Sequence, residues 1–91
     1  MTAEHDPEHS RFVIRLPDGD AELLYAPFGD DVLDLQHTEV PPSGQGKGVA
    51  DALIRAALAY AREHRMRVMA TCPYVQMWLR RHPAERPASH S

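Results

Sequence analysis

The sequence has little of several features that identify common classes of protein. It contains one cysteine, Cys72, among its 91 residues, which excludes an intramolecular disulfide and a cysteine-based zinc site. Its apolar runs are only a few residues long, too short to span a bilayer. Residues 1–10 lack the apolar segment of a secretory signal. Fewer than about 100 residues leave little room for a second core, so we expect one small domain. Because the sequence has neither an export signal nor a membrane span, we expect a cytoplasmic location and no membrane partner.

The sequence contains six histidines, which are potential metal ligands. His5 and His9 are four residues apart, but they lie in a polar segment that contains proline. His82 and His90 have no partner at a useful spacing. We therefore predict no metal site.

The net charge of −3 hides an uneven distribution. Residues 1–46 contain ten acidic residues and two arginines, whereas residues 47–91 contain eight basic and three acidic residues. A basic half in an acidic protein indicates an anionic ligand near that end of the chain. The alternative is that the acidic residues only keep a tail and several turns soluble.

Polar, proline-containing sequences mark both ends of the chain. We predict flexible tails at residues 1–10 and 84–91, on either side of a domain over residues 11–83. Alternating apolar residues and proline-glycine turns predict three strands, at residues 12–16, 21–26 and 32–40. A regular pleat in the third strand would put Leu33, Leu35, His37 and Glu39 on one face.

The second half of the domain alternates helix and strand. Apolar residues at helical spacing predict a helix over residues 49–61, and a strand follows at 67–71. A short helix at 74–82 ends at Pro83. The order is β-β-β-α-β-α, and a strand–helix–strand crossover is normally right-handed and parallel. We therefore expect an α+β fold with a mixed four-stranded sheet and two helices.

The most informative segment joins the third strand to the first helix. Pro41 and Pro42 end the strand, and Gly44, Gly46 and Gly48 then alternate with polar residues up to the helix. Glycine lets the backbone approach a ligand, and the N–H groups of a first helical turn have no partner within the helix. This series predicts a phosphate site rather than only a flexible turn. It is not a Walker motif, since no Ser or Thr follows Lys47.

The segment Gln45-Gly46-Lys47-Gly48-Val49-Ala50 resembles the Q/R-x-x-G-x-G/A signature of the GNAT acetyltransferase superfamily. The run from His37, with H-T-E-V-P before the signature and T-C-P-Y after it, is similar to the short, single-domain, YjdJ-like branch. The resemblance covers about residues 11–83. It implies a GNAT-like fold and an N-acetyltransferase that uses acetyl-coenzyme A.

The resemblance also implies where acetyl-coenzyme A binds. Its pyrophosphate would lie on the backbone N–H groups of residues 45–50, and its pantetheine arm would pair with the backbone near residues 38–40. The cofactor-binding residues are then Thr38, Val40, Gln45, Gly46, Lys47, Gly48, Val49 and Ala50. Further cations for the 3′-phosphate are Lys47, Arg80 and Arg81, each of which could equally be a solvated helix or loop charge.

Acetyl transfer needs a base, an oxyanion contact and a proton for the departing thiolate. The resemblance assigns the oxyanion contact to the backbone of Val40. Glu39 and His37 are candidate general bases, directly or through water. Cys72 is a candidate proton donor or nucleophile, and buried packing is its alternative role. Many GNAT proteins have a catalytic tyrosine further into the last helix, whereas the nearby tyrosine here is Tyr74.

Two functions from different classes remain open at this point. The chain is an N-acetyltransferase for an unidentified amine, such as one on a protein, or it is a non-catalytic module that binds coenzyme A or a protein partner. Nucleic-acid binding by the helix that carries Trp78, Arg80 and Arg81 ranks last, because only two arginines are adjacent and the protein is acidic. The sequence is compatible with a monomer or a homodimer.

Overall fold

The alternating segments form the antiparallel part of one sheet. In the computed structural model, which describes residues 2–86, β2 (Arg11–Leu16) pairs with β3 (Gly19–Phe28), and β3 pairs with β4 (Val32–Glu39). β5 (Arg67–Ala70) adds parallel to β4. The expected three-stranded meander with one parallel strand beside its third strand is therefore confirmed, as is the α+β class.

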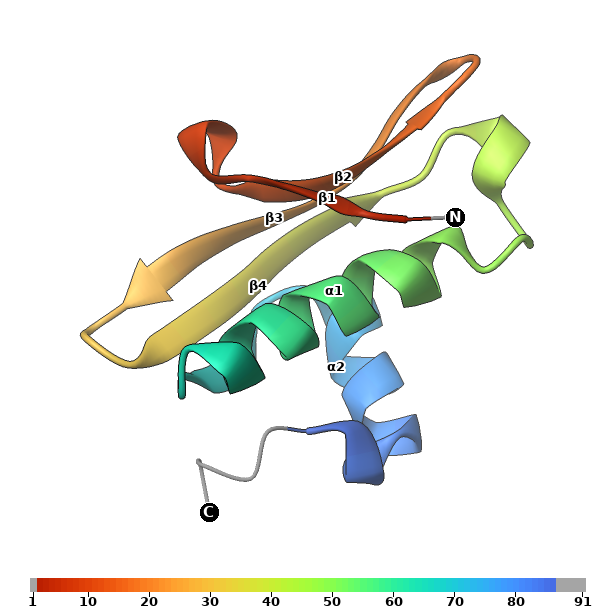
Figure 1. The fold of residues 1–91 in the computed structure, drawn as a ribbon. Helices are drawn as coiled ribbons and strands as arrows, with labels where there is room; N and C mark the ends of the chain where they lie inside the picture. Colours follow the sequence, from red (N-terminus) through yellow and green to blue (C-terminus); the bar gives the residue numbers. More distant parts are fainter. Residues whose placement is uncertain (1, 87–91) are drawn as a thin grey trace.

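Two helices lie on the same side of this sheet (Figure 1). α1 (Val49–Glu63) connects β4 to β5, and α2 (Pro73–Arg81) follows β5. The apolar stripe of α1 is buried, as its periodicity predicted. Val75, Trp78 and Leu79 of α2 are buried too, so both helices and one face of the sheet share a single core.

The prediction of a flexible tail at residues 1–10 is wrong for most of that segment. Glu4–Asp6 forms a fifth strand, β1, antiparallel to β2, and Pro7–His9 forms a 3-10 turn. The reason is a set of contacts with distant residues. His5 stacks on Phe12 at 4.5 Å between ring centroids and lies edge-on to Tyr60 of α1, and its Nε2 is 2.6 Å from the hydroxyl of Tyr25. Burial, together with nearby His64, lowers the pKa of His5.

The expected C-terminal tail is also too long. Pro83–Glu85 forms a 3-10 turn, and Glu85 is held by two arginines of α1. Arg55 Nη1 lies 2.8 Å from Glu85 Oε2, and Arg62 Nη2 donates to the Glu85 carbonyl at 2.9 Å. These partners are more than 20 residues away in sequence, so local composition does not reveal them. Residues 87–91 of the expected tail lie outside the described part of the chain.

The pleat of β4 is irregular, which corrects the expected face of its second half. Leu24 pairs with His37 but Tyr25 pairs with Leu35, so Gln36 is an extra residue in β4. Such a bulge re-aims the side chains that follow it. Leu33 and Leu35 are buried under the helices, whereas His37 and Glu39 are exposed and point to the opposite face.

None of the helices in residues 2–86 is both long and apolar enough to cross a membrane.

Candidate functional site

The second half of β4 has one free edge. Parallel pairing with β5 ends at Leu35 and Ala70, and the N–H groups of Thr71 and Cys72 both turn to the Leu35 carbonyl at 3.0 and 3.1 Å. β4 nevertheless continues to Glu39 and is paired there only with β3. An extended ligand could therefore pair with this edge as an additional strand would.

Asp34 fixes the point at which β4 and β5 separate. Its carboxylate is only 7% exposed and accepts hydrogen bonds from the backbone N–H and the hydroxyl of Thr71, at 3.1 and 2.9 Å. Gln36 donates to it as well, at 3.2 Å. The sequence analysis missed this residue. The signal was an acidic residue between two leucines in a strand, which has to find polar partners if it is buried.

The loop after β4 is anchored by a residue from another turn. Asp18, between β2 and β3, accepts hydrogen bonds from both the backbone N–H and the hydroxyl of Ser43. These bonds, the one from the Ser43 hydroxyl foremost, lower the pKa of Asp18. Gln45 Nε2 donates to the Val40 carbonyl at 3.1 Å and closes the loop on itself. Sequence reasoning missed Asp18, because 25 residues separate it from Ser43.

The glycines of this loop have two different roles. A Cβ on Gly44 would lie 2.6 Å from Leu16 Cδ1 and 3.0 Å from Val40 Cγ1, so this glycine is needed for packing. Gly46 and Gly48 have φ of +75° and +79°, which favours glycine, and a Cβ on either would meet open space. Gly48 is the N-cap of α1, and its missing side chain leaves the first turn without a side-chain cap. The backbone there is free to contact a ligand.

A pocket of about 540 Å³ lies between this loop, β4 and α2. It contains seven of the eight predicted cofactor-binding residues; Lys47 is the exception. The lining residues are Thr38, Val40, Gly44, Gln45, Gly46, Gly48, Val49, Ala50, Asp51 and Tyr74. Glycine backbone, an uncapped helix and a free strand edge thus meet in one cavity, an arrangement that suits a long ligand carrying phosphate.

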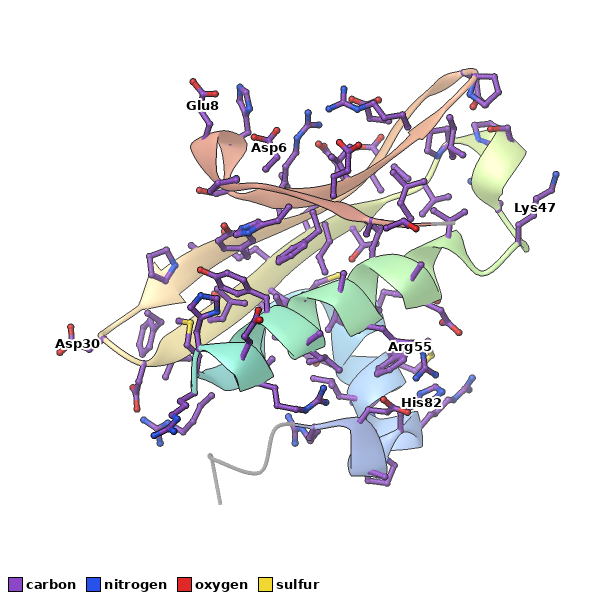
Figure 2. The ribbon with its side chains drawn as sticks, in the orientation of Figure 1. Asp6, Glu8, Asp30, Lys47, Arg55 and His82 are labelled. Atoms are coloured by element: carbon purple, nitrogen blue, oxygen red, sulfur yellow. The ribbon has the colours of Figure 1, made fainter. Side chains whose placement is uncertain are left out.

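The three cations predicted for the 3′-phosphate do not line this pocket: Lys47, Arg80 and Arg81. Lys47 extends from the loop away from α1, as Figure 2 shows. Arg80 and Arg81 are exposed in the last turn of α2. We call the loop backbone from Gln45 and the first turn of α1 the cradle. The groups that the cradle offers to an anion are therefore backbone N–H groups rather than cationic side chains.

Asp51 connects the pocket to α2. It lies in the first turn of α1, and its Oδ1 accepts a hydrogen bond from Trp78 Nε1 at 2.7 Å. The indole also stacks on His82, with 3.9 Å between ring centroids, and Arg55 lies 5.2 Å from its centre. Figure 2 labels Arg55 and His82 beside this helix. The start of α1 and the middle of α2 are thereby held together.

The three predicted catalytic residues are not brought into one place. His37 Nε2 and Glu39 Oε1 lie 3.7 Å apart on the face away from the helices, with side chains 59% and 68% exposed. Cys72 is on the helix side, 6% exposed and part of the core. Its Sγ is 3.7 Å from the hydroxyl of Thr38, which does line the pocket. Cys72 itself does not line it.

Tyr74 lines the pocket from the start of the last helix, not from the later position expected of the family tyrosine. It is in the first turn of α2, is 42% exposed, and shares the pocket lining with Thr38 and Ala50. The sequence analysis noted that it is near the site but did not include it among the site residues. Its place in the pocket lining depends on how α2 packs beside β4, which could not be predicted from spacing alone.

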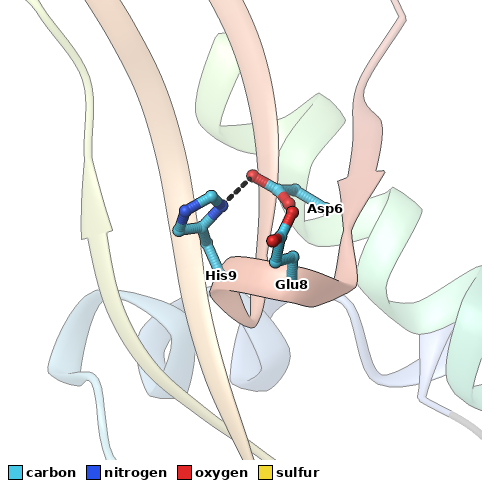
Figure 3. Close-up of side chains that lie close together, drawn as sticks. All are labelled: Asp6, Glu8 and His9. Atoms are coloured by element: carbon cyan, nitrogen blue, oxygen red, sulfur yellow. Dashed lines mark hydrogen bonds and ion pairs between the residues drawn. The ribbon is translucent and has the colours of Figure 1, made fainter.

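One group of possible metal ligands lies near the N-terminus. The ligand atoms of Asp6, Glu8 and His9 lie within 4.8 Å of one another (Figure 3). Asp6 is already bonded to Arg11 Nε at 2.9 Å and to His9 Nδ1 at 3.0 Å, and the Arg11 bond lowers its pKa. These contacts hold the turn after β1 against β2. The prediction that the protein has no metal site stays a prediction.

Similarity to known proteins agrees with this geometry. The chain is 37% identical over 92 residues to Protein NATD1 of Gallus gallus, covering 99% of this chain and 84% of the relative. It is 39% identical over 85 residues to Protein NATD1 of Homo sapiens, covering 91% and 75%. A GCN5-like protein of Staphylococcus aureus solved by NMR has the same fold, with a TM-score of 0.72, 22% identity and coverage of 91% and 81%.

The match extends over nearly the whole described chain. Residues 11–87 fit the sequence pattern of the family described as GCN5-related N-acetyl-transferase. The resemblance seen in the sequence is thus confirmed at the level of the family, while the YjdJ-like branch stays an expectation. The chain belongs to the GCN5-related N-acetyltransferase family.

Proposed function

We propose that this protein transfers the acetyl group of acetyl-coenzyme A to an amine. The observation that carries the proposal is the single pocket in which the uncapped start of α1 meets the free edge of β4. Acetyl-coenzyme A has a diphosphate at one end of a long amide-containing arm. A helix start suits the diphosphate, and a strand edge suits the amides.

The residues present fit this co-substrate. The backbone N–H groups of residues 46 and 48–50 would hold the diphosphate, and positive φ at Gly46 and Gly48 lets that backbone approach closely. The N–H groups of Gln45 and Lys47 donate instead to carbonyls within the loop, at 3.2 and 3.3 Å. Thr38 and Val40 would pair with the pantetheine arm. Lys47, Arg80 and Arg81 are then available for the 3′-phosphate, outside the pocket lining. Asp51 adds a negative charge to the lining, and its bond to Trp78 holds that charge toward α2.

Transfer requires a new C–N bond and loss of the C–S bond. The amine nitrogen attacks the thioester carbon, the carbonyl oxygen becomes an oxyanion, and the thiolate leaves with a proton. The amine must give up a proton, and Glu39 or His37, on the open side of β4, would accept it directly or through water. The backbone N–H of Val40, at the end of the strand, would contact the oxyanion.

Two residues compete for the role of proton donor to the thiolate. Tyr74 lines the pocket and is partly exposed, whereas Cys72 is in the core behind Thr38. We assign the proton donor to Tyr74 and a positioning role behind Thr38 to Cys72. A covalent acetyl-cysteine intermediate would need the thiol to reach a pocket that it does not line.

Binding can be tested with a matched pair of variants on α1. Acetyl-coenzyme A at saturating concentration should raise the melting temperature, because a ligand that binds only the folded state stabilises it. Ala50→Glu places a carboxylate in the cradle and should abolish the shift. Ala59→Glu makes the same change at an exposed position of α1 and should preserve it. No shift for the unmodified protein at millimolar ligand would overturn the proposal.

Turnover separates an enzyme from a module that only binds coenzyme A. Thiol release should be measured with a panel of amines, together with intact mass after exposure to acetyl-coenzyme A. Release that depends on an amine supports transfer. Tight binding with neither release nor acetylation would favour the non-catalytic module.

A further inference from the structure

The helices leave one face of the sheet uncovered, and that face is acidic. Because side chains alternate along a strand, the residues next to the buried core positions point away from the helices. We call this surface the open face. Three arginines lie on it: Arg11, Arg15 and Arg67. Five accessible carboxylates lie on it: Glu4, Asp6, Asp20, Glu22 and Glu39, while Asp34 is buried.

Each arginine of the open face is already paired, and Arg11 is paired with carboxylates of both β1 and β3. Arg11 binds Asp6 and Glu22, each at 2.9 Å, and lies 3.5 Å from Asp20. Arg15 lies 3.6 Å from Glu4. Arg67 is at the far end of β5, where it pairs with Asp31 at 3.4 Å. The end of the open face nearest the pocket therefore has a surplus of negative charge.

Two glutamates occupy opposite positions on neighbouring strands at that end. Glu22 and Glu39 are register partners in the antiparallel β3–β4 pair. Like charges directly opposite each other destabilise a sheet. Arg11 already offsets the charge of Glu22, so Glu39 is the carboxylate of this pair that a bound cation would compensate. Arg11 lies 2.9 Å from Glu22, whereas Glu39 lies 3.7 Å from the imidazole of His37.

This acidic end borders the pocket. Thr38 lines the pocket on the helix side of β4, and its neighbours His37 and Glu39 point to the open face because of the bulge at Gln36. If acetyl-coenzyme A occupies the pocket, its thioester is reached from the open face past these two residues. The acceptor would then arrive over Glu22 and Glu39.

The shape of the surface indicates the size of the acceptor. The pocket beside β4 is not lined by Glu22, His37 or Glu39, and neither is the smaller hollow beside β5. The side chains of His37 and Glu39 are more than half exposed. Small molecules usually bind in concave sites that cover most of their surface. An exposed, charged sheet face is better suited to a polypeptide, which can cover a broad surface.

We propose that the open face docks a basic polypeptide segment, with its surplus carboxylates, Glu22 among them, binding cationic side chains beside the lysine that is acetylated. The inference rests on the proposed function for the acceptor's chemistry, but the docking step can be measured without turnover. If the open face docks such a segment, the protein should prefer acceptor peptides with positive charge around the target lysine.

The test uses the full protein and three nine-residue peptides with a central lysine. Their flanking residues are arginine, serine or glutamate. Peptide binding is followed by NMR titration, and acetylation by mass spectrometry in the presence of acetyl-coenzyme A. The arginine peptide should exceed the glutamate peptide by about tenfold in kcat/KM at low ionic strength, and the ratio should shrink at high salt.

Charge variants show whether the preference comes from this face. Glu22→Lys should reduce the arginine-to-glutamate ratio at least about threefold. Glu22→Gln, which keeps a hydrogen-bond acceptor for Arg11, should reduce it less and controls for folding. Glu63→Lys, at the exposed end of α1, should leave it unchanged. Melting temperatures identify any variant that has lost its fold.

Each outcome separates the two proposals. Selective binding of the arginine peptide without acetylation would leave the docking surface standing and overturn the proposed function. Acetylation of all three peptides at equal rates would overturn the docking inference alone. Faster acetylation of a free polyamine than of any peptide would overturn the polypeptide acceptor.

Discussion

The two halves of β4 differ in almost every physical respect. Residues 32–35 have a strand on each side, and Leu33 and Leu35 are fully buried. Residues 36–39 have a strand on one side, begin with a bulge, and expose His37 and Glu39. The same strand therefore supplies stability in its first half and an open edge for ligands in its second. Substitutions should separate these two contributions.

The largest effect is expected in the first half. Leu35→Ala should lower the free energy of unfolding by about 2–5 kcal/mol, because it removes a buried side chain and leaves a cavity. Chemical denaturation measures the loss. An equal loss for Val32→Ala, which is partly exposed in the same half, would show that burial is not the determining factor.

Glu39→Gln tests the second half. If Glu39 is the base, turnover should fall by about 10²-fold or more, while stability changes by less than about 0.5 kcal/mol. His37→Gln is the matched variant, and the larger loss of kcat identifies the base. A variant that loses acetyl-coenzyme A affinity but keeps kcat would contradict a catalytic role.

Asp34 lies at the boundary between the halves. Asp34→Ala removes the acceptor of two Thr71 hydrogen bonds and should cost about 1–3 kcal/mol of stability. Asp30→Ala, in the exposed turn before β4, should cost little. Equal losses in the two variants would contradict a specific role for the buried carboxylate.

The smallest effect concerns the loop after β4. The pKa of Asp18 is lowered in the folded state, so its bonds to Ser43 stabilise the fold above the ordinary carboxyl pKa of 3.8, and this contribution is lost as pH falls through the lower folded value. Asp18→Asn should therefore melt slightly earlier than the unmodified protein at pH 6. The two curves should converge in acid, and a constant gap down to pH 2 would contradict this assignment.

Local patterns predicted most of the fold and the outline of the site. The stripe from Val49 to Ala61, the turns and the glycine segment are all encoded in neighbouring residues, so α1, the meander and the cradle were predictable. Features that depend on distant partners were not. β1 depends on His5 meeting Phe12 and Tyr60, and the loop anchor depends on Asp18 meeting Ser43.

The bulge in β4 is the other feature that the sequence concealed. An alternating pattern is a sum of local preferences, and one inserted residue reverses every face after it. His37 and Glu39 were therefore predicted on the face of Leu33, whereas Gln36 moves them to the other side. Cys72 was hard to place for a related reason, since a cysteine has the same sequence signature in a core as in a site.

The hydrogen bond between Trp78 and Asp51 links the intrinsic fluorescence of the protein to its pocket. Trp78 is the single tryptophan of the sequence, so all indole emission comes from one side chain. That side chain is 3% exposed, stacked on His82, and hydrogen-bonded to a residue that lines the pocket. Because Asp51 lines the pocket, we expect a bound anion to change the electric field at the indole nitrogen. Intrinsic fluorescence can therefore follow a titration in real time without any label.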